Sequence, residues 1–449
     1  MKLTHLLALG SAVSLAAVSG FPATRSSSKS TTRSLEPASF FLGTLPRTHT
    51  GTPSCPGKTY HFHQLQRTVA NPSIRWTTTG TTMAMAPPAA GMLDMVVQGS
   101  SGGALIGLAA AVLLLGNGNV MGCSGIVSST VLRTPRTILR DTSVHWKGVF
   151  ITAMILTSFL LQASMTTTSA PTTLSAAGFA LAGLLVGFGT KLGNGCTSGH
   201  GICGLARRSQ RSLAAVLTFM TSGALTTTLL ATLKKATTTG VNSSWMAATL
   251  WKTTSALTSP NHTVATMITT MAVSLTILIP VLAKLKGQAS ATRNDVAKFG
   301  PAGVAGALFA LGLQRSGMAE SAKISGFLNV GGFFTGTWDA TLLFVMSAGL
   351  LVSWISYQWV QGSQTITACP TLDCPIVLQE GSFAVPSVTS IDKNLLLGAA
   401  IFGIGWGIAG ICPGPAVVQA AMGVPGVVRY WWPAYFVGAY VSEQFKQRQ

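Results

Sequence analysis

Long apolar runs recur along the chain from about residue 93 to its C-terminal end, separated by short polar stretches. A helix needs about 20 apolar residues, at about 1.5 Å per residue, to cross the roughly 30 Å hydrocarbon core of a bilayer. Nine runs approach that length, and each predicts a membrane-spanning helix. They lie near residues 99–116, 146–164, 174–191, 212–233, 264–285, 300–314, 340–358, 394–409 and 429–445.

Four further apolar segments are only about half a span long, and each begins at a break that is rich in glycine or contains proline. Short interrupted segments in corresponding positions of two halves point to a site near the midplane of the membrane, built from discontinuous helices. We therefore predict four re-entrant half-helices, at residues 119–130, 196–206, 325–334 and 413–422.

Internal repetition supports two related halves. Asn-Val-Met-Gly at 119–122 recurs as Asn-Val-Gly-Gly at 329–332, and the Phe-Gly pair at 188–189 recurs at 402–403. The fold predicted is an all-α membrane protein with about nine transmembrane helices plus four re-entrant half-helices in two inverted repeats. The first repeat is expected at 91–235, a linker with one transmembrane helix at 236–297, and the second repeat at 298–449. Two G-x-x-x-G pairs, at 103–107 and 183–187, predict closely packed helices.

Composition agrees with a membrane location. Only 9% of the residues are charged and 48% are hydrophobic, with a mean hydropathy of +0.48, whereas a soluble protein carries roughly 25% charged residues. The formal net charge of +19 comes from basic residues that lie between the apolar runs, as in membrane loops. That distribution argues against nucleic acid as a partner and makes the lipid bilayer the expected surroundings.

The first ninety residues have the composition of targeting sequences. Residues 1–20 read as a signal peptide, and residues 21–90 as a disordered, transit-peptide-like segment with seven Lys or Arg, one acidic residue and many Ser and Thr. This order, with Phe21 at the junction, resembles the bipartite presequences of algae with complex plastids. It implies a multi-pass protein of a plastid envelope. The alternative is a secreted, disordered tail on a plasma-membrane protein.

Three of the four breaks carry a cysteine within two residues of a glycine: Cys123, Cys196 and Cys412. An isolated cysteine in a spanning helix is most often a small apolar filler. Three at the starts of half-helices are a different case, because glycines such as Gly195, Gly199 and Gly410 let the backbone approach a ligand and helix N-termini favour an anion. Since a thiol is a weak, polarizable donor, we expect a ligand that itself offers sulfur.

Other candidates around the breaks form a secondary path. Cys203 follows Cys196 by seven positions and would share its face on a continuous helix, and His200 reads as a donor, because too few ligands surround it for a metal. The asparagines at the breaks complete this set: Asn119, Asn194 and Asn329.

Two further features have alternative interpretations. Asp339 is either a functional ionisable group within the membrane or, the interpretation we favour, a helix cap. Cys369 and Cys374, in a polar loop, are either a disulfide or two free thiols.

The residues at the breaks resemble those of the YeeE/YedE family of sulfur-compound transporters. The similarity rests on Asn-Gly-Cys-Thr-Ser-Gly-His-Gly-Ile-Cys-Gly at 194–204 and Gly-Ile-Gly-Trp-Gly-Ile-Ala-Gly-Ile-Cys-Pro-Gly-Pro at 403–415. Gly-Phe-Leu-Asn-Val at 326–330, leading to Trp338 and Asp339, is similar to the family's second part, which some bacteria encode as a separate half-size polypeptide. The resemblance implies a thiosulfate-type importer in which Cys123, Cys196 and Cys412 pass the ion through S–H···S contacts.

Three function classes follow from these observations. A transporter of a small sulfur-containing anion, with thiosulfate or a related ion and a soluble sulfur-carrier protein as partners, is the leading interpretation. A membrane thiol sulfurtransferase or redox protein and a non-selective anion channel are the alternatives. The leading interpretation requires no enzyme activity, cofactor or metal, and the chain has no nucleotide-binding motif.

Overall fold

A computed structural model describes residues 89–131, 142–164, 174–238, 299–361, 375–376, 383–386 and 388–448. The presequence, the predicted span near 264–285 and both loop cysteines, Cys369 and Cys374, lie outside these residues. The domain boundaries within them stay predictions.

Within the described residues the protein is all helical, without a β-strand. The N-terminal part consists of α2 (Ala89–Asn117), α3 (Cys123–Val131), α5 (Thr142–Ser164), α6 (Ala176–Leu192), η1 (Thr197–Gly204) and α7 (Gln210–Thr238). The C-terminal part consists of α11 (Phe299–Arg315), α12 (Ser321–Leu328), α13 (Gly331–Thr335), α14 (Thr341–Gln361), α15 (Lys393–Ala409), α16 (Pro413–Ala421), η3 (Val427–Trp431) and α17 (Trp432–Gln447).

Helices occupy all the predicted spans that lie in the described residues. By length and apolar composition, four helical stretches could cross a membrane: Gly91–Asn117, Gln210–Lys235, Thr341–Val360 and Lys393–Ala421. A fifth is counted if α6 and η1, which meet at a bend of 44°, form one broken span. The described part therefore contains four to five candidate membrane spans, and the number nine stays a prediction.

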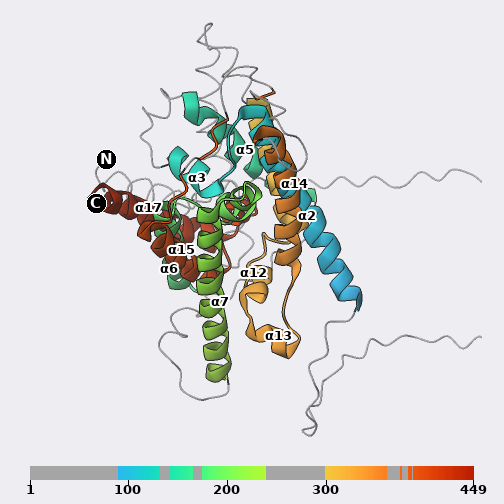
Figure 1. The fold of residues 1–449 in the computed structure, drawn as a ribbon. Coiled ribbons are helices and arrows are strands. Elements are labelled where there is room, and N and C mark those ends of the chain that lie inside the picture. The colour runs from blue at the N-terminus through green and yellow to red at the C-terminus, as the bar shows by residue number, and fades with distance from the viewer. Residues whose placement is uncertain are drawn as a thin grey trace, which may run out of the picture. The chain divides into compact units, whose positions relative to one another are not determined.

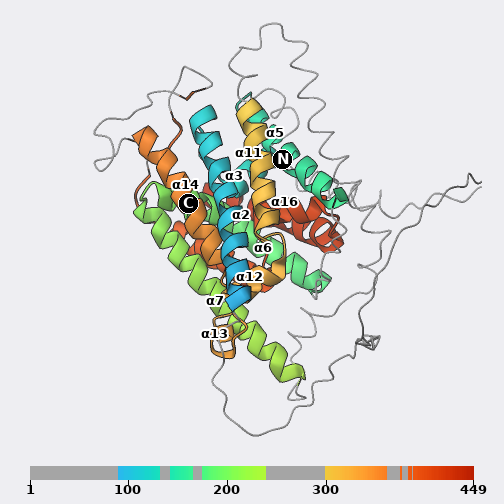
Figure 2. The ribbon, with the colours of Figure 1, turned by 90° about the vertical axis from the view of Figure 1, so that its right-hand side faces the viewer.

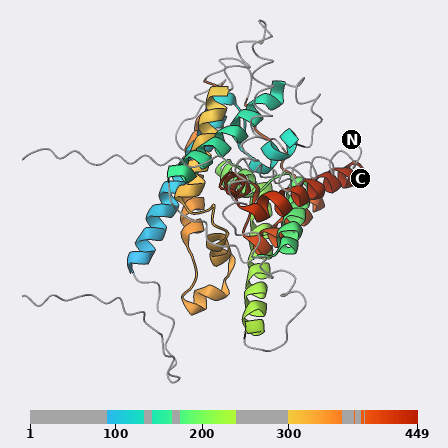
Figure 3. The same cartoon turned by 180° about the vertical axis from the view of Figure 1, so that it is seen from behind.

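Two groups of long helices pack side by side. α2 lies against both α14 and α11, and α11 also contacts α5 (Figures 1 and 2). In the other group α6 lies against α17 and α15, and α15 also packs on α7, as seen from behind in Figure 3. The short helices α3, η1, α12 and α16 lie at the breaks between the long ones.

Close helix packing at both G-x-x-x-G pairs is confirmed. A Cβ on Gly107 of α2 would lie 2.6 Å from the carbonyl oxygen of Gly349 in α14. A Cβ on Gly187 of α6 would lie 2.7 Å from the carbonyl carbon of Tyr435 in α17. Small residues let backbones approach in this way, which is how helices associate in lipid, where apolar burial gives little driving force.

The breaks themselves have identifiable causes. α15 ends at Gly410, which has a φ of +65° and donates its N–H to the carbonyl of Trp406 at 2.7 Å. α6 ends before Asn194, a left-handed residue with a φ of +57°. Gly410 precedes Cys412 by two residues, and Asn194 precedes Cys196 by two. Both cysteines therefore lie between a long helix and a short one.

Candidate functional site

Each of the three predicted cysteines lies at the start of a short helix. Cys123 is the first residue of α3, and Cys196 and Cys412 are the residues that precede η1 and α16. All three thiols are free and buried, with exposed fractions of 1%, 1% and 7%. The breaks seen in the sequence therefore place these thiols inside the protein and not at its periphery.

Residues 196–198 connect the three cysteines. The Ser198 hydroxyl lies 3.3 Å from the Cys196 sulfur and accepts a hydrogen bond from the backbone N–H of Cys123 at 3.1 Å. The neighbouring hydroxyl of Thr197 lies 3.5 Å from the sulfur of Cys412. Three segments that are far apart in the sequence thus meet at one point.

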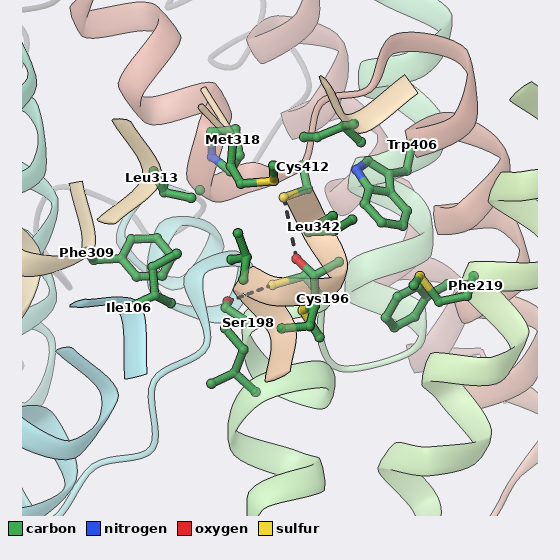
Figure 4. A pocket seen from close by; sticks show the side chains of 18 residues that line it. Ile106, Cys196, Ser198, Phe219, Phe309, Leu313, Met318, Leu342, Trp406 and Cys412 are labelled. Atoms are coloured by element: carbon green, nitrogen blue, oxygen red, sulfur yellow. Dashed lines mark hydrogen bonds between the residues drawn. The ribbon is translucent and has the colours of Figure 1, made fainter. Parts of the chain in front are cut away.

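A small cavity adjoins this meeting point, and Cys196, Thr197, Ser198 and Cys412 line it (Figure 4). Its volume is about 50 Å³, on a scale where one water molecule needs about 10–15 Å³. It can therefore hold a few waters or one ion of similar total size.

The lining of the cavity is apolar and rich in sulfur. Besides the two cysteines, three thioethers contribute: Met220, Met318 and Met346. Apart from Thr197, Ser198 and the indole of Trp406, the other lining residues are aliphatic or aromatic side chains, glycine and proline, and no charged side chain or histidine belongs to this described lining.

The start of α16 offers fewer backbone donors than a helix N-terminus usually does. Pro413 and Pro415 have no N–H, and the N–H of Ala416 is bonded to the Cys412 carbonyl at 3.0 Å, which leaves only that of Gly414 in the first turn. The expected cradle of free N–H groups is therefore not provided by this half-helix, and an anion here must find other donors.

The two remaining polar residues of the η1 segment point away from the cavity. The His200 ring is hydrogen-bonded to the hydroxyl of Ser212 at 3.1 Å and to the carbonyl of Gly193 at 3.2 Å. It therefore links η1 to α7 and to the C-terminal end of α6. The Cys203 thiol faces Tyr357 and the backbone of Met121. η1 is π-helical, with fewer degrees of rotation per residue than an α-helix, so the seven-residue alignment of Cys196 with Cys203 expected for an α-helix does not apply.

The asparagines of the secondary path also lie outside the cavity lining. Asn119 donates to the Asn117 carbonyl at 3.0 Å, and Asn194 accepts a hydrogen bond from Lys446 at 2.8 Å. Asn329 ends α12 and accepts the N–H of Gly332 at 2.9 Å. These contacts hold the breaks in shape, and a direct role for the asparagines in the path stays a prediction.

Asp339 accepts a hydrogen bond from the backbone N–H of Thr341, the first residue of α14, at 2.9 Å. This is the contact that a helix cap makes.

The glycines singled out from the sequence have different surroundings. A Cβ on Gly195 would lie 2.5 Å from the His200 ring, so only glycine fits there, whereas the nearest atom to a Cβ on Gly199 is 3.8 Å away. No group of three potential metal ligands occurs among the described residues.

Basic residues lie outside the cavity lining, near the helix ends. Arg207 donates to the carbonyl of Pro386 at 2.8 Å, and Arg211, in the first turn of α7, forms an ion pair with Asp392 and donates to the carbonyl of Ser390.

Sequence reasoning did not assign several residues that the structure places at the site, among them Thr197, Ser198, Trp406 and Met318. Thr197 and Ser198 lie within a quoted motif, but nothing in the letters indicates that their hydroxyls contact thiols from other segments. Trp406 lies within the other quoted motif and lines the cavity beside Cys412. The thioether of Met318, from the turn between α11 and α12, could not be assigned without the tertiary structure.

Fold and site together define a helical membrane protein with a buried cavity lined by thiols and thioethers. Residues 301–448 match a family of unknown function, DUF6691. Two proteins of Xylella fastidiosa strain Temecula1, each described as a probable transporter, are similar to this chain. One is 35% identical over 133 residues, covering 30% of this chain and 80% of the relative. The other is 38% identical over 135 residues, covering 29% and 90%. The chain belongs to the family of these bacterial proteins and is much longer than either.

Proposed function

We propose that this protein is a membrane transporter of a small sulfur-containing anion, and that thiosulfate is the ion that suits it best. The observation that carries the proposal is the meeting of three buried cysteines, from the starts of three separate short helices, at Thr197 and Ser198. Two of them, Cys196 and Cys412, line the cavity, and Cys123 lies behind Ser198 outside the lining. The ion passes Cys412, Cys196 and Cys123 in contact with their sulfur atoms. The relatives described as probable transporters support transport as the general activity, and the YeeE/YedE-type motifs support sulfur as the cargo.

The chemistry of the cavity favours an ion with a soft end. A sulfate ion carries its charge on hard oxygens, and it loses several kcal/mol of hydration in an apolar site unless strong donors replace the water. The described cavity lining holds no cation to do so. A terminal sulfur atom is larger, more polarizable and more weakly hydrated, so thiols and thioethers replace its water at a smaller cost. A volume of about 50 Å³ corresponds to a few water molecules at about 10–15 Å³ each, which is of the same order as the five heavy atoms of thiosulfate.

The order of the helices supports two related halves. The first half has the order long helix, short helix, two long helices, short helix and long helix, and the second half has the same order with two additional short segments, α13 and η3. The long helices of the two halves can be matched in order: α2 with α11, α5 with α14, α6 with α15, and α7 with α17. Each contact between the halves then has a counterpart, because α2 packs on α14 as α11 packs on α5, and α6 packs on α17 as α15 packs on α7. This is the pattern expected of the inverted repeats and the nine spans that we propose, with the cavity at their interface.

A covalent sulfurtransferase is less favoured by the site. A thiol that accepts sulfur needs a neighbouring base to form the thiolate, and the nearest histidine in these motifs, His200, is bonded to Ser212 and Gly193.

The composition of residues 1–90 supports delivery to a plastid envelope, with the plasma membrane as the alternative. A soluble sulfur-carrier protein is the proposed acceptor of the transported ion. Imaging a fluorescent C-terminal fusion in a cell with a complex plastid distinguishes the two membranes.

Uptake of labelled thiosulfate and labelled sulfate by a sulfur-auxotrophic microbe that expresses the full chain tests the function. We expect thiosulfate uptake well above that of sulfate. Cys412→Ser should remove most of it, because a hydroxyl is smaller and harder than a thiol. Cys203→Ser is the matched control, since Cys203 is equally buried but outside the cavity lining, and it should retain uptake. Equal uptake of both ions by the unmodified protein would instead indicate a non-selective anion channel.

A further inference from the structure

Trp406, in the last turn of α15, has a buried N–H group without a hydrogen-bond partner. The side chain is 2% exposed, its Nε1 atom has no acceptor, and the residue lines the cavity next to Cys412. Figure 4 shows the indole nitrogen on the edge of the ring nearer to Cys412. Burying an unpaired N–H is unfavourable, and such groups in native structures call for an explanation.

The ring is held in place by aromatic neighbours, so the N–H has a fixed direction. It stacks on Phe402 with a centroid distance of 6.0 Å and an interplanar angle of 13°, and its contact with Phe219 is edge-on at 6.0 Å and 78°. Rotating the ring to find an acceptor would break both contacts. The donor is therefore preorganised toward the cavity.

Other indoles in the described structure do find acceptors. Trp338 donates to the carbonyl of Phe327 at 2.7 Å, and Trp432 donates to that of Ala416 at 3.3 Å. Trp431 has an unpaired Nε1 as well, but it does not line the cavity and lies stacked on Tyr435. Trp406 thus combines an unpaired donor with a place in the cavity lining.

The other polar side chains around the cavity are already engaged. Ser198 is bonded to the N–H of Cys123 and contacts the Cys196 sulfur, and Thr197 contacts the sulfur of Cys412. At the start of α16, Pro413 and Pro415 carry no N–H, and the N–H of Ala416 is bonded to the Cys412 carbonyl. Among the nitrogen and oxygen atoms of the described lining side chains, the Trp406 N–H is consequently the one donor without a partner that an entering oxygen atom can meet.

We propose that Trp406 is a specificity-determining residue whose N–H binds an oxygen of the transported anion while the thiols of Cys412 and Cys196 contact its sulfur. The inference rests on the proposed function and narrows its substrate class to ions that have both an oxyanion end and a terminal sulfur. Sulfate lacks the soft end, and hydrosulfide lacks the oxygen. The cavity therefore recognises both the oxyanion end and the terminal sulfur of one ion.

The test is uptake into vesicles that contain the full chain, with labelled thiosulfate as the probe and unlabelled hydrosulfide as the competitor. Trp406→Phe keeps an aromatic ring and removes the N–H. A hydrogen bond to a charged group should be worth about ten-fold or more in apparent affinity, so we expect at least that loss for thiosulfate and unchanged inhibition by hydrosulfide. Trp359→Phe, on the exposed part of α14, is the matched control and should leave both values unchanged.

A second substitution separates the hydrogen bond from packing. Replacing Trp406 with 3-benzothienylalanine keeps the shape of the ring and exchanges the N–H for sulfur, so the same loss is expected even if the phenylalanine variant folds poorly. Full thiosulfate affinity in either folded variant overturns the role of Trp406 and leaves the proposed function intact. Absence of thiosulfate uptake by the unmodified protein overturns both.

Discussion

Substitution of Gly410 by alanine should damage both stability and transport, because this residue forms the turn between α15 and Cys412. Its φ of +65° lies in the left-handed region, which costs a residue with a Cβ about 1–2 kcal/mol. A Cβ would also lie 2.5 Å from the carbonyl oxygen of Ser321 and 2.9 Å from the hydroxyl oxygen of Ser325, both in α12.

The second effect is steric. Carbon atoms in ordinary contact lie about 3.5–4.0 Å from their neighbours, so α12 would have to move by roughly 1 Å. Overpacking of this kind costs about 1–3 kcal/mol, which brings the total to about 2–5 kcal/mol if the two effects add. Because Cys412 follows two residues later, any shift of the turn also changes its 3.5 Å contact with Thr197.

The apparent melting temperature of purified protein in detergent, followed by tryptophan fluorescence, measures the first consequence, and thiosulfate uptake measures the second. Gly300→Ala is the control, since no atom lies within 4 Å of the added Cβ and alanine is the better helix former. It should leave both values intact. If Gly410→Ala melts and transports like Gly300→Ala, the turn does not position the cysteine and the reasoning is wrong.

Two further predictions concern helix packing and pH. Gly187→Ala should lower the melting temperature by an amount equivalent to about 1–3 kcal/mol, because the added Cβ would lie 2.7 Å from the carbonyl carbon of Tyr435. Gly300→Ala is again the control. Equal melting temperatures of the two variants would contradict close packing of α6 on α17. Partial burial raises the pKa of Asp392, but the hydrogen bond and charge of Arg211 outweigh this and hold the pKa below its usual range. The ion pair therefore adds stability above the unfolded-state pKa of about 3.9 and loses it as the pH falls through the lower folded-state value. Asp392→Asn should cost at most about 1 kcal/mol at pH 7, and a melting difference that persists well below pH 3 would refute this assignment.

Much of the helical framework could be predicted from the sequence, because the apolar runs and their breaks are local features. The predicted segment 300–314 and the observed α11 (Phe299–Arg315) differ by one residue at each end, and 394–409 and α15 (Lys393–Ala409) agree as closely. The predicted half-helix at 325–334 was wrong in its bounds. The structure has α12 at Ser321–Leu328 and then α13 at Gly331–Thr335, because Asn329 ends the first helix and the left-handed Gly336 ends the second.

The site was only partly predictable, for a physical reason. The placement of Cys123, Cys196 and Cys412 at helix starts follows from the glycines beside them, but the lining of a cavity depends on which faces of distant helices meet. An indole in a glycine-rich apolar helix has the same sequence surroundings whether it faces lipid or a cavity, so Trp406 could not be assigned. The π-helical geometry of η1, which separates Cys203 from Cys196, has no sequence signature that distinguishes it from an α-helix.

The absence of charge from the described cavity lining is itself suited to transport. A single cation about 4 Å from the anion would add about 4 kcal/mol of attraction for each negative charge at an effective dielectric constant near 20, and 4 kcal/mol alone corresponds to roughly a thousand-fold slower release. The basic residues of the described structure lie instead near the helix ends, where Arg207 and Arg211 contact carbonyls and Asp392. There they can attract an anion without holding it. On the function that we propose, thiols, thioethers and one indole N–H discriminate by softness and shape, so selectivity in this site need not depend on tight binding.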